Sequence, residues 1–127
     1  APHAPHAPPA PQTRSVPHTV AELAEICAIP PASREFTAAN FFCRGFLAGV
    51  GQYHGALHPL DGPRPPLFCV PSPPPTLLAA ANAFVAWTRA NPQHGDEAAV
   101  DGLVRFAVAA WPCPPGTGRP AARRGGG

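Results

Sequence analysis

The sequence predicts an all-α fold, a compact bundle of about four helices that is stapled by disulfides and contains a proline-rich crossover. Apolar residues recur at helical spacing in four stretches, prolines gather between and outside them, and all four cysteines lie in the same central part. The 127 residues are enough for one domain. We therefore expect a helical domain over residues 19–114, between a disordered Pro/His-rich linker at 1–18 and a disordered Gly/Arg-rich tail at 115–127.

The first two predicted helices span residues 20–27 and 34–57. Thr19 is placed to cap the first one, and Glu22 three residues later completes a capping box. Two prolines end this helix, because proline disfavours helical backbone in the residue before it. Ser33 is the expected cap of the second helix.

The second helix carries two glycines four residues apart, Gly45 and Gly49. Each glycine in a helix interior costs about 1 kcal/mol relative to alanine. We therefore expect a flat spot there, where close packing of another backbone offsets the loss. The expected inward stripe of this helix is Phe36, Ala39, Cys43, Phe46, Val50 and Leu57.

A crossover over residues 58–75 holds eight prolines and is expected to be extended. Its apolar stretch 67–70 should pack across the helices. The third helix is predicted over 77–90 with Thr76 as its cap. After a turn-rich loop the fourth helix is predicted over 97–110, with Asp96 as its cap and a proline after its end.

The cysteines Cys27, Cys43, Cys69 and Cys113 are separated by 16, 26 and 44 residues, so the close ligand pairs typical of zinc sites are absent. An even number in a small chain favours disulfides in an oxidising compartment, and four reduced buried thiols are the alternative. Four cysteines allow three connectivities. An antiparallel hairpin of the third and fourth helices would favour Cys69 with Cys113, which leaves Cys27 for Cys43.

The distribution of charge along the chain does not predict a nucleic-acid partner. The net charge is +2, but residues 19–113 hold five arginines against seven acidic residues, so the basic excess lies in the tails. No apolar run approaches the ~20 residues of a membrane span. The chain begins at Ala1 without a leader, which fits either a chain after signal-peptide removal or a trimmed one.

No catalytic motif is found: there is no nucleophile elbow, phosphate-binding loop or His-Glu-x-x-His. We expect no cofactor and no metal. His54 and His58 are spaced as a metal pair, but histidines also suit the C-terminus of a helix, and this interpretation is favoured. The acidic group Asp96, Glu97 and Asp101 suits the start of a helix better than acid–base chemistry.

Four features in order resemble the Rap/Tai immunity-protein family, which is associated with bacterial type VI secretion. They are a short helix that ends in cysteine (23–27), a Cys-x-Gly-aromatic-x-x-Gly helix (43–49), an aromatic-Cys-x-Pro segment before a capping threonine (68–71 and Thr76), and a helix-Pro-helix unit that ends in aromatic-Pro-Cys (Pro92 and 111–113). Together they cover roughly residues 19–114. The sequence departs from the pattern at Trp111, where phenylalanine is usual, and at the proline-rich turn 72–75.

The resemblance implies a small periplasmic protein, a homodimer in many relatives, that binds an incoming peptidoglycan amidase and blocks its active site without chemistry of its own. The alternatives are a structural or chaperone-like envelope module of the same fold, and an enzyme or metal carrier that uses His54, His58 and the tail histidines. For an inhibitor, the loop between the third and fourth helices is the first candidate surface, because it is polar and held at both ends. Its candidate binding residues are Asn91, Gln93, His94, Asp96 and Glu97. The surface beside His54 and His58 is the second candidate.

Overall fold

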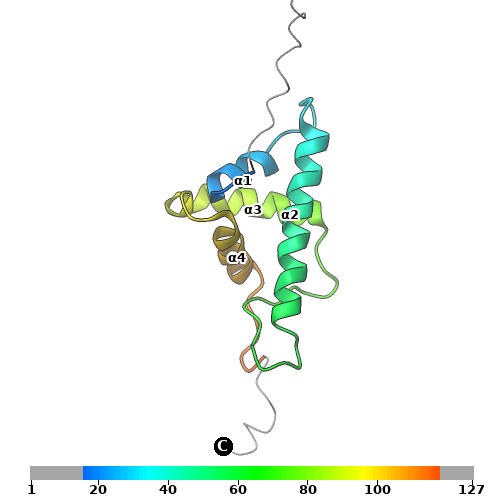
Figure 1. Cartoon of the computed structure of the whole chain (residues 1–127), viewed down its shortest axis with the longest axis vertical. Coiled ribbons are helices and arrows are strands. Elements are labelled where there is room, and N and C mark those ends of the chain that lie inside the picture. Colours follow the sequence, from blue (N-terminus) through cyan, green and yellow to red (C-terminus); the bar gives the residue numbers. More distant parts are fainter. Residues whose placement is uncertain (1–15, 118–127) are drawn as a thin grey trace, which may run out of the picture.

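The computed structural model describes residues 16–117, and these form an all-helical fold with no strand among them, as predicted. The elements are α1 (Val20–Cys27), α2 (Phe36–Leu57), α3 (Leu77–Ala90), the 3-10 helix η1 (Pro92–His94) and α4 (Ala99–Ala110). The two expected tails fall mainly in residues 1–15 and 118–127, outside the described part. Figure 1 shows α2 as the longest element, with the crossover (residues 58–75) looping back from its lower end toward the start of α3.

The short helix α1 is the centre of the packing, because it contacts α2, α3 and α4. By contrast α3 and α4 touch each other sparingly, and Figure 1 shows α3 running across α4. The predicted antiparallel hairpin of these two helices is therefore wrong. The connection through η1 redirects the chain, so that α1 can insert its apolar face between the helices on either side.

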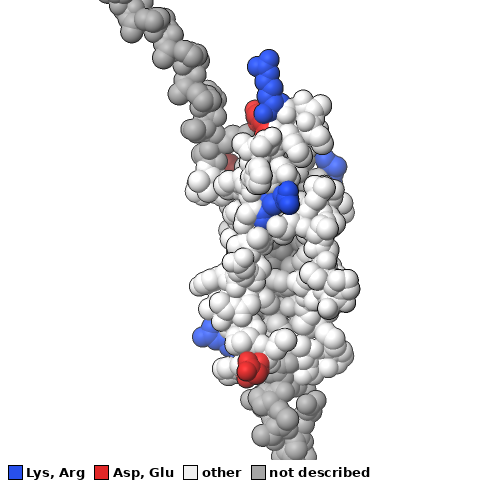
Figure 2. Space-filling view, turned by 90° about the vertical axis from the view of Figure 1, so that its right-hand side faces the viewer, with Lys and Arg blue, Asp and Glu red and all other residues white. Residues whose placement is uncertain are grey.

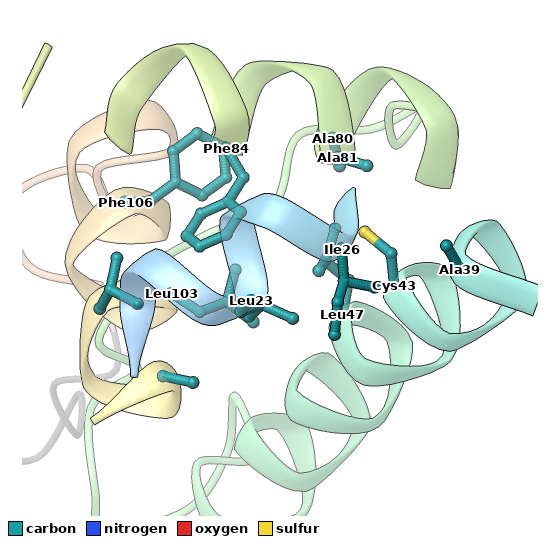
Figure 3. Packing of buried hydrophobic residues seen from close by; sticks show 12 residues of the cluster. Leu23, Ile26, Ala39, Cys43, Leu47, Ala80, Ala81, Phe84, Leu103 and Phe106 are labelled. Carbon is teal, nitrogen blue, oxygen red and sulfur yellow. The ribbon is translucent and has the colours of Figure 1, made fainter. Parts of the chain in front are cut away.

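The core is a single cluster of aliphatic and aromatic side chains from all four α-helices. Figure 3 shows Leu23 of α1 in its middle, with Phe84 and Phe106 on one side and Cys43 and Leu47 of α2 on the other. Leu23 and Phe84 have no exposed surface, and the rings of Phe84 and Phe106 meet edge to face at 5.7 Å. Burying one such side chain completely stabilises a fold by about 1.5–3 kcal/mol.

Local capping explains where α1 begins. The Thr19 hydroxyl accepts a hydrogen bond from the Glu22 N–H at 3.2 Å, and the Glu22 carboxylate accepts from the Thr19 N–H at 3.0 Å. The predicted capping box is therefore confirmed. Bonds from the backbone N–H groups of His18 and Thr19 stabilise the ionised carboxylate and lower the pKa of Glu22.

Two other helices begin later than predicted. Ser33 does not cap α2, because its hydroxyl accepts from the Glu35 N–H within a separate turn, and α2 begins at Phe36. Asp96 does not cap α4, which begins at Ala99 after Ala98 in an extended conformation. The cause lies in tertiary structure: Thr19 and Ala98 form an isolated antiparallel β-bridge, so helical backbone begins only after Ala98.

The glycines of α2 do not make the expected flat spot. Gly45 and Gly49 are both exposed, and a Cβ atom built on either would meet nothing within 4 Å. Ala39 and Cys43 of the expected inward stripe are buried, and Phe46 and Val50 pack half-buried against the core. Leu47 is buried as well, whereas Leu57 is 37% exposed. The face of α2 that carries the glycines points away from the core.

Replacing Gly45 with alanine should therefore raise the free energy of unfolding by about 0.5–1 kcal/mol, because alanine loses less backbone entropy on folding and has room for its methyl group. The measurement is chemical unfolding followed by circular dichroism, with Gly49→Ala as a parallel variant. Destabilisation by either substitution would mean that another surface covers this face of α2 in solution.

Two disulfides fasten the fold. One joins Cys27 at the end of α1 to Cys43 in α2, and the other joins Cys69 in the crossover to Cys113 after α4. This is the pairing that the sequence favoured, although the hairpin on which the preference rested does not form. Cys69 and Cys113 meet instead because the Cys69 N–H donates to the Trp111 carbonyl at 2.8 Å, which aligns the crossover with the end of α4.

Candidate functional site

The loop 91–97 joins α3 to α4 and contains η1. Backbone hydrogen bonds to the start of α1 hold it: the Val20 N–H donates to the Glu97 carbonyl at 2.9 Å, and the Ala21 N–H donates to the Gly95 carbonyl at 3.0 Å. At its first residue, the Asn91 side-chain amide donates to the Trp87 carbonyl at 2.8 Å and so closes the end of α3. Hydrogen bonds to the start of α1 and to the end of α3 therefore restrain the backbone of the loop.

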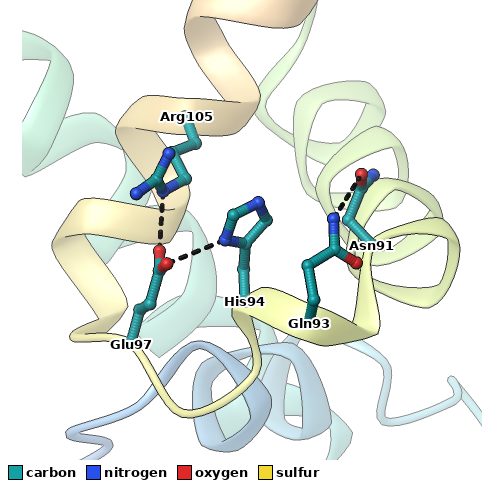
Figure 4. A network of polar contacts seen from close by, with 5 residues as sticks. All are labelled: Asn91, Gln93, His94, Glu97 and Arg105. Carbon is teal, nitrogen blue, oxygen red and sulfur yellow. Dashed lines mark hydrogen bonds and ion pairs between the residues drawn. The ribbon is translucent and has the colours of Figure 1, made fainter.

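A network of side chains stiffens the loop from outside (Figure 4). The His94 Nδ1–H donates to the Glu97 carboxylate at 2.8 Å, and Arg105 on α4 donates its Nε–H to the other oxygen at 2.7 Å. The His94 ring also lies parallel to the Trp87 indole, with centroids 5.7 Å apart. His94 is thus held by stacking on one face and by a charge-assisted hydrogen bond at its edge.

Electrostatics favours the ionised network. The hydrogen bond from His94, and then that from Arg105, stabilises the Glu97 carboxylate and lowers its pKa below the ordinary 4.5. The ionised Glu97 network contributes to the stability of the fold above pH 4.5, and this contribution is lost as the pH falls through the lowered pKa of Glu97. At neutral pH the loop therefore presents a fixed carboxylate between two cationic or donor groups.

The five predicted binding residues are brought together, but they do different things. His94, Glu97 and Asn91 hold the loop in shape, while Gln93 makes only a long 3.5 Å contact with Asn91. Asp96 is exposed and has no side-chain hydrogen bond or ion pair within residues 16–117. Gln93 and Asp96 are thus the side chains of this loop that are available to a partner.

Sequence reasoning missed Trp87 and Arg105 as members of this site. Taken as the first residue of a helix, Glu97 is eight residues from Arg105, which is too far for a contact along one helix face. The contact forms because Glu97 lies in the bend before α4 and not in the helix itself. The position of Trp87, one helical turn before Asn91, was the one local signal in the sequence that it belongs to this site.

The second candidate surface lies at the end of α2. The His54 Nε2 accepts a hydrogen bond from the Leu67 N–H at 3.0 Å, and the His58 Nδ1–H donates to the Pro65 carbonyl at 2.9 Å. The His54 ring stacks on Phe68 with centroids 3.9 Å apart. The two histidines therefore fasten the crossover to α2, and one ring nitrogen of each is already occupied.

Within residues 16–117 no group of three or more His, Cys, Asp or Glu side chains is arranged to hold a metal ion. The pair His54 and His58 has no third ligand, and all four cysteines are oxidised. Asp101 lies in the first turn of α4, where a carboxylate meets the positive end of the helix dipole.

Acid should weaken the attachment of the crossover. Burial, and then the neighbouring His58, lowers the pKa of His54 below the ordinary 6.5. The unfolded chain therefore takes up this proton first, so the contribution of His54 to stability is complete above pH 6.5 and is lost as the pH falls through the lowered value. Protonation also places a donor on Nε2, where it opposes the Leu67 N–H.

His54→Gln should flatten the pH dependence of the unfolding free energy between pH 7 and pH 5, because a glutamine amide oxygen accepts the same hydrogen bond without titrating. The measurement is urea unfolding across this pH range. Thr37→Ala, an exposed position on α2 without a titratable group, is the control and should keep the wild-type slope. If both variants keep that slope, His54 is not the titrating anchor.

Comparison with known proteins gives one match. The family model described as Rap1a immunity proteins matches residues 19–113, which is most of the described chain. No curated protein and no solved structure matches the sequence. Among the described residues no helix has the length and apolar character needed to cross a membrane.

Proposed function

The chain belongs to the Rap1a immunity protein family, and from this membership we propose that it is a periplasmic inhibitor of a peptidoglycan amidase delivered by type VI secretion. Immunity proteins of this family act on secreted effectors, so a protein partner is expected. The inhibitor would bind the amidase and block its active site without chemistry of its own. Two disulfides support the periplasmic location, because they persist in oxidising compartments.

The observation that carries the proposal is the set of hydrogen bonds that holds the loop 91–97. Ordering a flexible loop on binding weakens affinity, whereas a loop already held in one shape loses little entropy. Here α1 fixes the backbone and the network of His94, Glu97 and Arg105 fixes the side chains. A polar loop of this kind can enter an active-site cleft with Gln93 and Asp96 in place to make hydrogen bonds.

A structural or chaperone-like envelope module is the second candidate function. It is favoured by the exposed apolar side chains Phe41, Tyr53 and Leu60, which are 68%, 67% and 77% exposed. Such surfaces often mark contacts with other proteins. This function predicts many weak partners, whereas an inhibitor has one strong partner.

The first experiment is a pull-down of the oxidised protein from envelope extract of its own source, read by mass spectrometry. Support requires one stoichiometric partner with amidase-type catalytic residues, whose hydrolysis of peptidoglycan stops at a one-to-one ratio. Several weak partners, or a stoichiometric partner whose activity is unchanged, would contradict inhibition and favour the structural module.

Replacing His94, Asp96 and Glu97 with alanine should weaken binding to such an amidase about tenfold or more, which corresponds to about 1.4 kcal/mol. The change removes one contact group and releases the network that holds the loop. The measurement is calorimetric titration of the oxidised proteins. A control variant, Glu25→Ala with Asp61→Ala, also removes two carboxylates, but from exposed positions outside the loop. Equal affinity of both variants would exclude the loop.

A further inference from the structure

A cavity of about 390 Å³ lies between α2, the crossover, α3 and α4. Its volume falls in the range of ligand sites, about 300–1,000 Å³. Each neighbouring element contributes to its wall, and none of the lining side chains is charged. The larger lining residues are Leu47, Phe68, Leu77, Leu103, Phe106 and Trp111.

Small residues on facing helices explain why the space is not filled. Ala48 and Gly51 of α2 lie opposite Ala80 of α3 and Ala107 of α4 along the lining. A Cβ atom built on Gly51 would meet nothing within 4 Å. The crossover cannot collapse into the space, because the histidine hydrogen bonds and the stacking of His54 on Phe68 hold it in place.

The surface around the cavity is uncharged as well. The segments that meet there, residues 45–60, 65–88 and 106–117, contain no Lys, Arg, Asp or Glu. Figure 2 shows one face of the molecule in which charged side chains lie toward the upper and lower parts and an uncharged band separates them. A charged ligand would therefore find no counter-ion at the cavity.

The polar content of the lining restricts the ligand further. Gln52 is the only lining residue with a polar side chain other than the indole of Trp111. Water that lies against this lining has few polar partners there, and its displacement by an apolar group is favourable. An apolar cavity of about 150 Å³ already holds a benzene ring, so this one has room for a larger hydrocarbon.

The geometry points to a ligand-binding site in this cavity for a small uncharged hydrocarbon molecule with one polar group, such as a medium-chain alcohol or acyl ester, its polar end at Gln52. The site is separate from the loop 91–97. The cavity shares no lining residue with the loop, although Phe106 in its wall meets Trp87 edge to face, and Trp87 stacks on His94. Ligand binding and partner binding are therefore measured in separate assays.

The test uses the neutral fluorescent probe N-phenyl-1-naphthylamine and the oxidised full chain. We expect saturable one-to-one binding that 1-decanol displaces. Gly51→Leu should place a side chain in the cavity and weaken probe binding about tenfold or more, while helix propensity keeps the variant folded. Gly55→Leu is the matched control, because this glycine lies one turn further along α2, also has open space and does not line the cavity.

The site is established if Gly55→Leu binds the probe with wild-type affinity while Gly51→Leu binds it more weakly. The proposal is overturned if the probe does not saturate, if both leucine variants bind it equally, or if 1-decanol fails to displace it. Sedimentation tests one further outcome. If the wild type is a dimer that binds no probe, and only Gly51→Leu dissociates it, then a second copy of the chain covers the cavity and the proposal is overturned.

Discussion

Removing the disulfide between Cys69 and Cys113 should lower the free energy of unfolding by about 4 kcal/mol, because it closes a long loop with a sequence separation of 44. Domains of this size are stable by only about 5–15 kcal/mol, so a quarter or more of the margin depends on this bond. Its effect is large for a second reason. Cys69 is half-buried in the crossover, where few other contacts hold the chain, and the disulfide keeps the Cys69 N–H on the Trp111 carbonyl.

The measurement is guanidinium unfolding of a Cys69→Ala, Cys113→Ala double variant, with mass spectrometry to verify that Cys27 and Cys43 remain bonded. Trp111 lies against Phe68, with ring centroids 6.3 Å apart, so its fluorescence reports on the crossover. The reciprocal variant without Cys27 and Cys43 should retain the wild-type environment of Trp111. A loss below about 1 kcal/mol would mean that the histidine contacts alone hold the crossover.

The same comparison bears on the proposed ligand site. The crossover supplies one wall of the cavity through Phe68, and it is fastened at His54, at His58 and at the disulfide. Without the disulfide, the remaining attachments include one that acid weakens. The double variant should therefore lose stability in parallel with the wild type as the pH falls below 6.5, from a lower starting value, because the pH slope depends on the lowered pKa of His54 and not on the disulfide.

Features with local causes could be predicted from the sequence. The capping box of Thr19 and Glu22 and the cap of Thr76 on α3 depend on residues three apart, and both are present. The prolines that end helices act on their immediate neighbours in the same way. These signals predicted four helices, and α1 and α3 have the expected bounds.

Features with tertiary causes could not be predicted. The start of α4 is set by pairing of Ala98 with Thr19, which are far apart in the chain. The network at Glu97 depends on that late start, so its contact with Arg105 was hidden as well. Gly45 and Gly49 formed a recognisable spacing but lie on an open face, because spacing alone does not show which side of a helix another backbone approaches.

The glycine that does permit a close approach is Gly102 in α4, which carries no motif. Gly102 is buried, and a Cβ atom there would lie 3.1 Å from the Cβ of Val20 and closer still to one of its methyl groups. Val20 cannot move aside easily, since it is 1% exposed and its branched side chain has one preferred rotamer in a helix. The crossing of α1 over α4 therefore requires a residue without a side chain.

Gly102→Ala should destabilise the fold by about 1–3 kcal/mol through overpacking, although alanine favours a helix. This is opposite in sign to the effect expected for Gly45→Ala, and chemical unfolding of both variants measures the contrast. The double variant Gly102→Ala with Val20→Ala should be less destabilised than the sum of its single changes, because the smaller side chain removes the clash. Additive effects, or a stabilised Gly102→Ala, would mean that α1 and α4 are not packed this closely. Because the Val20 N–H also holds the Glu97 carbonyl, a displaced α1 should loosen the loop 91–97 and weaken the proposed binding of an amidase together with stability.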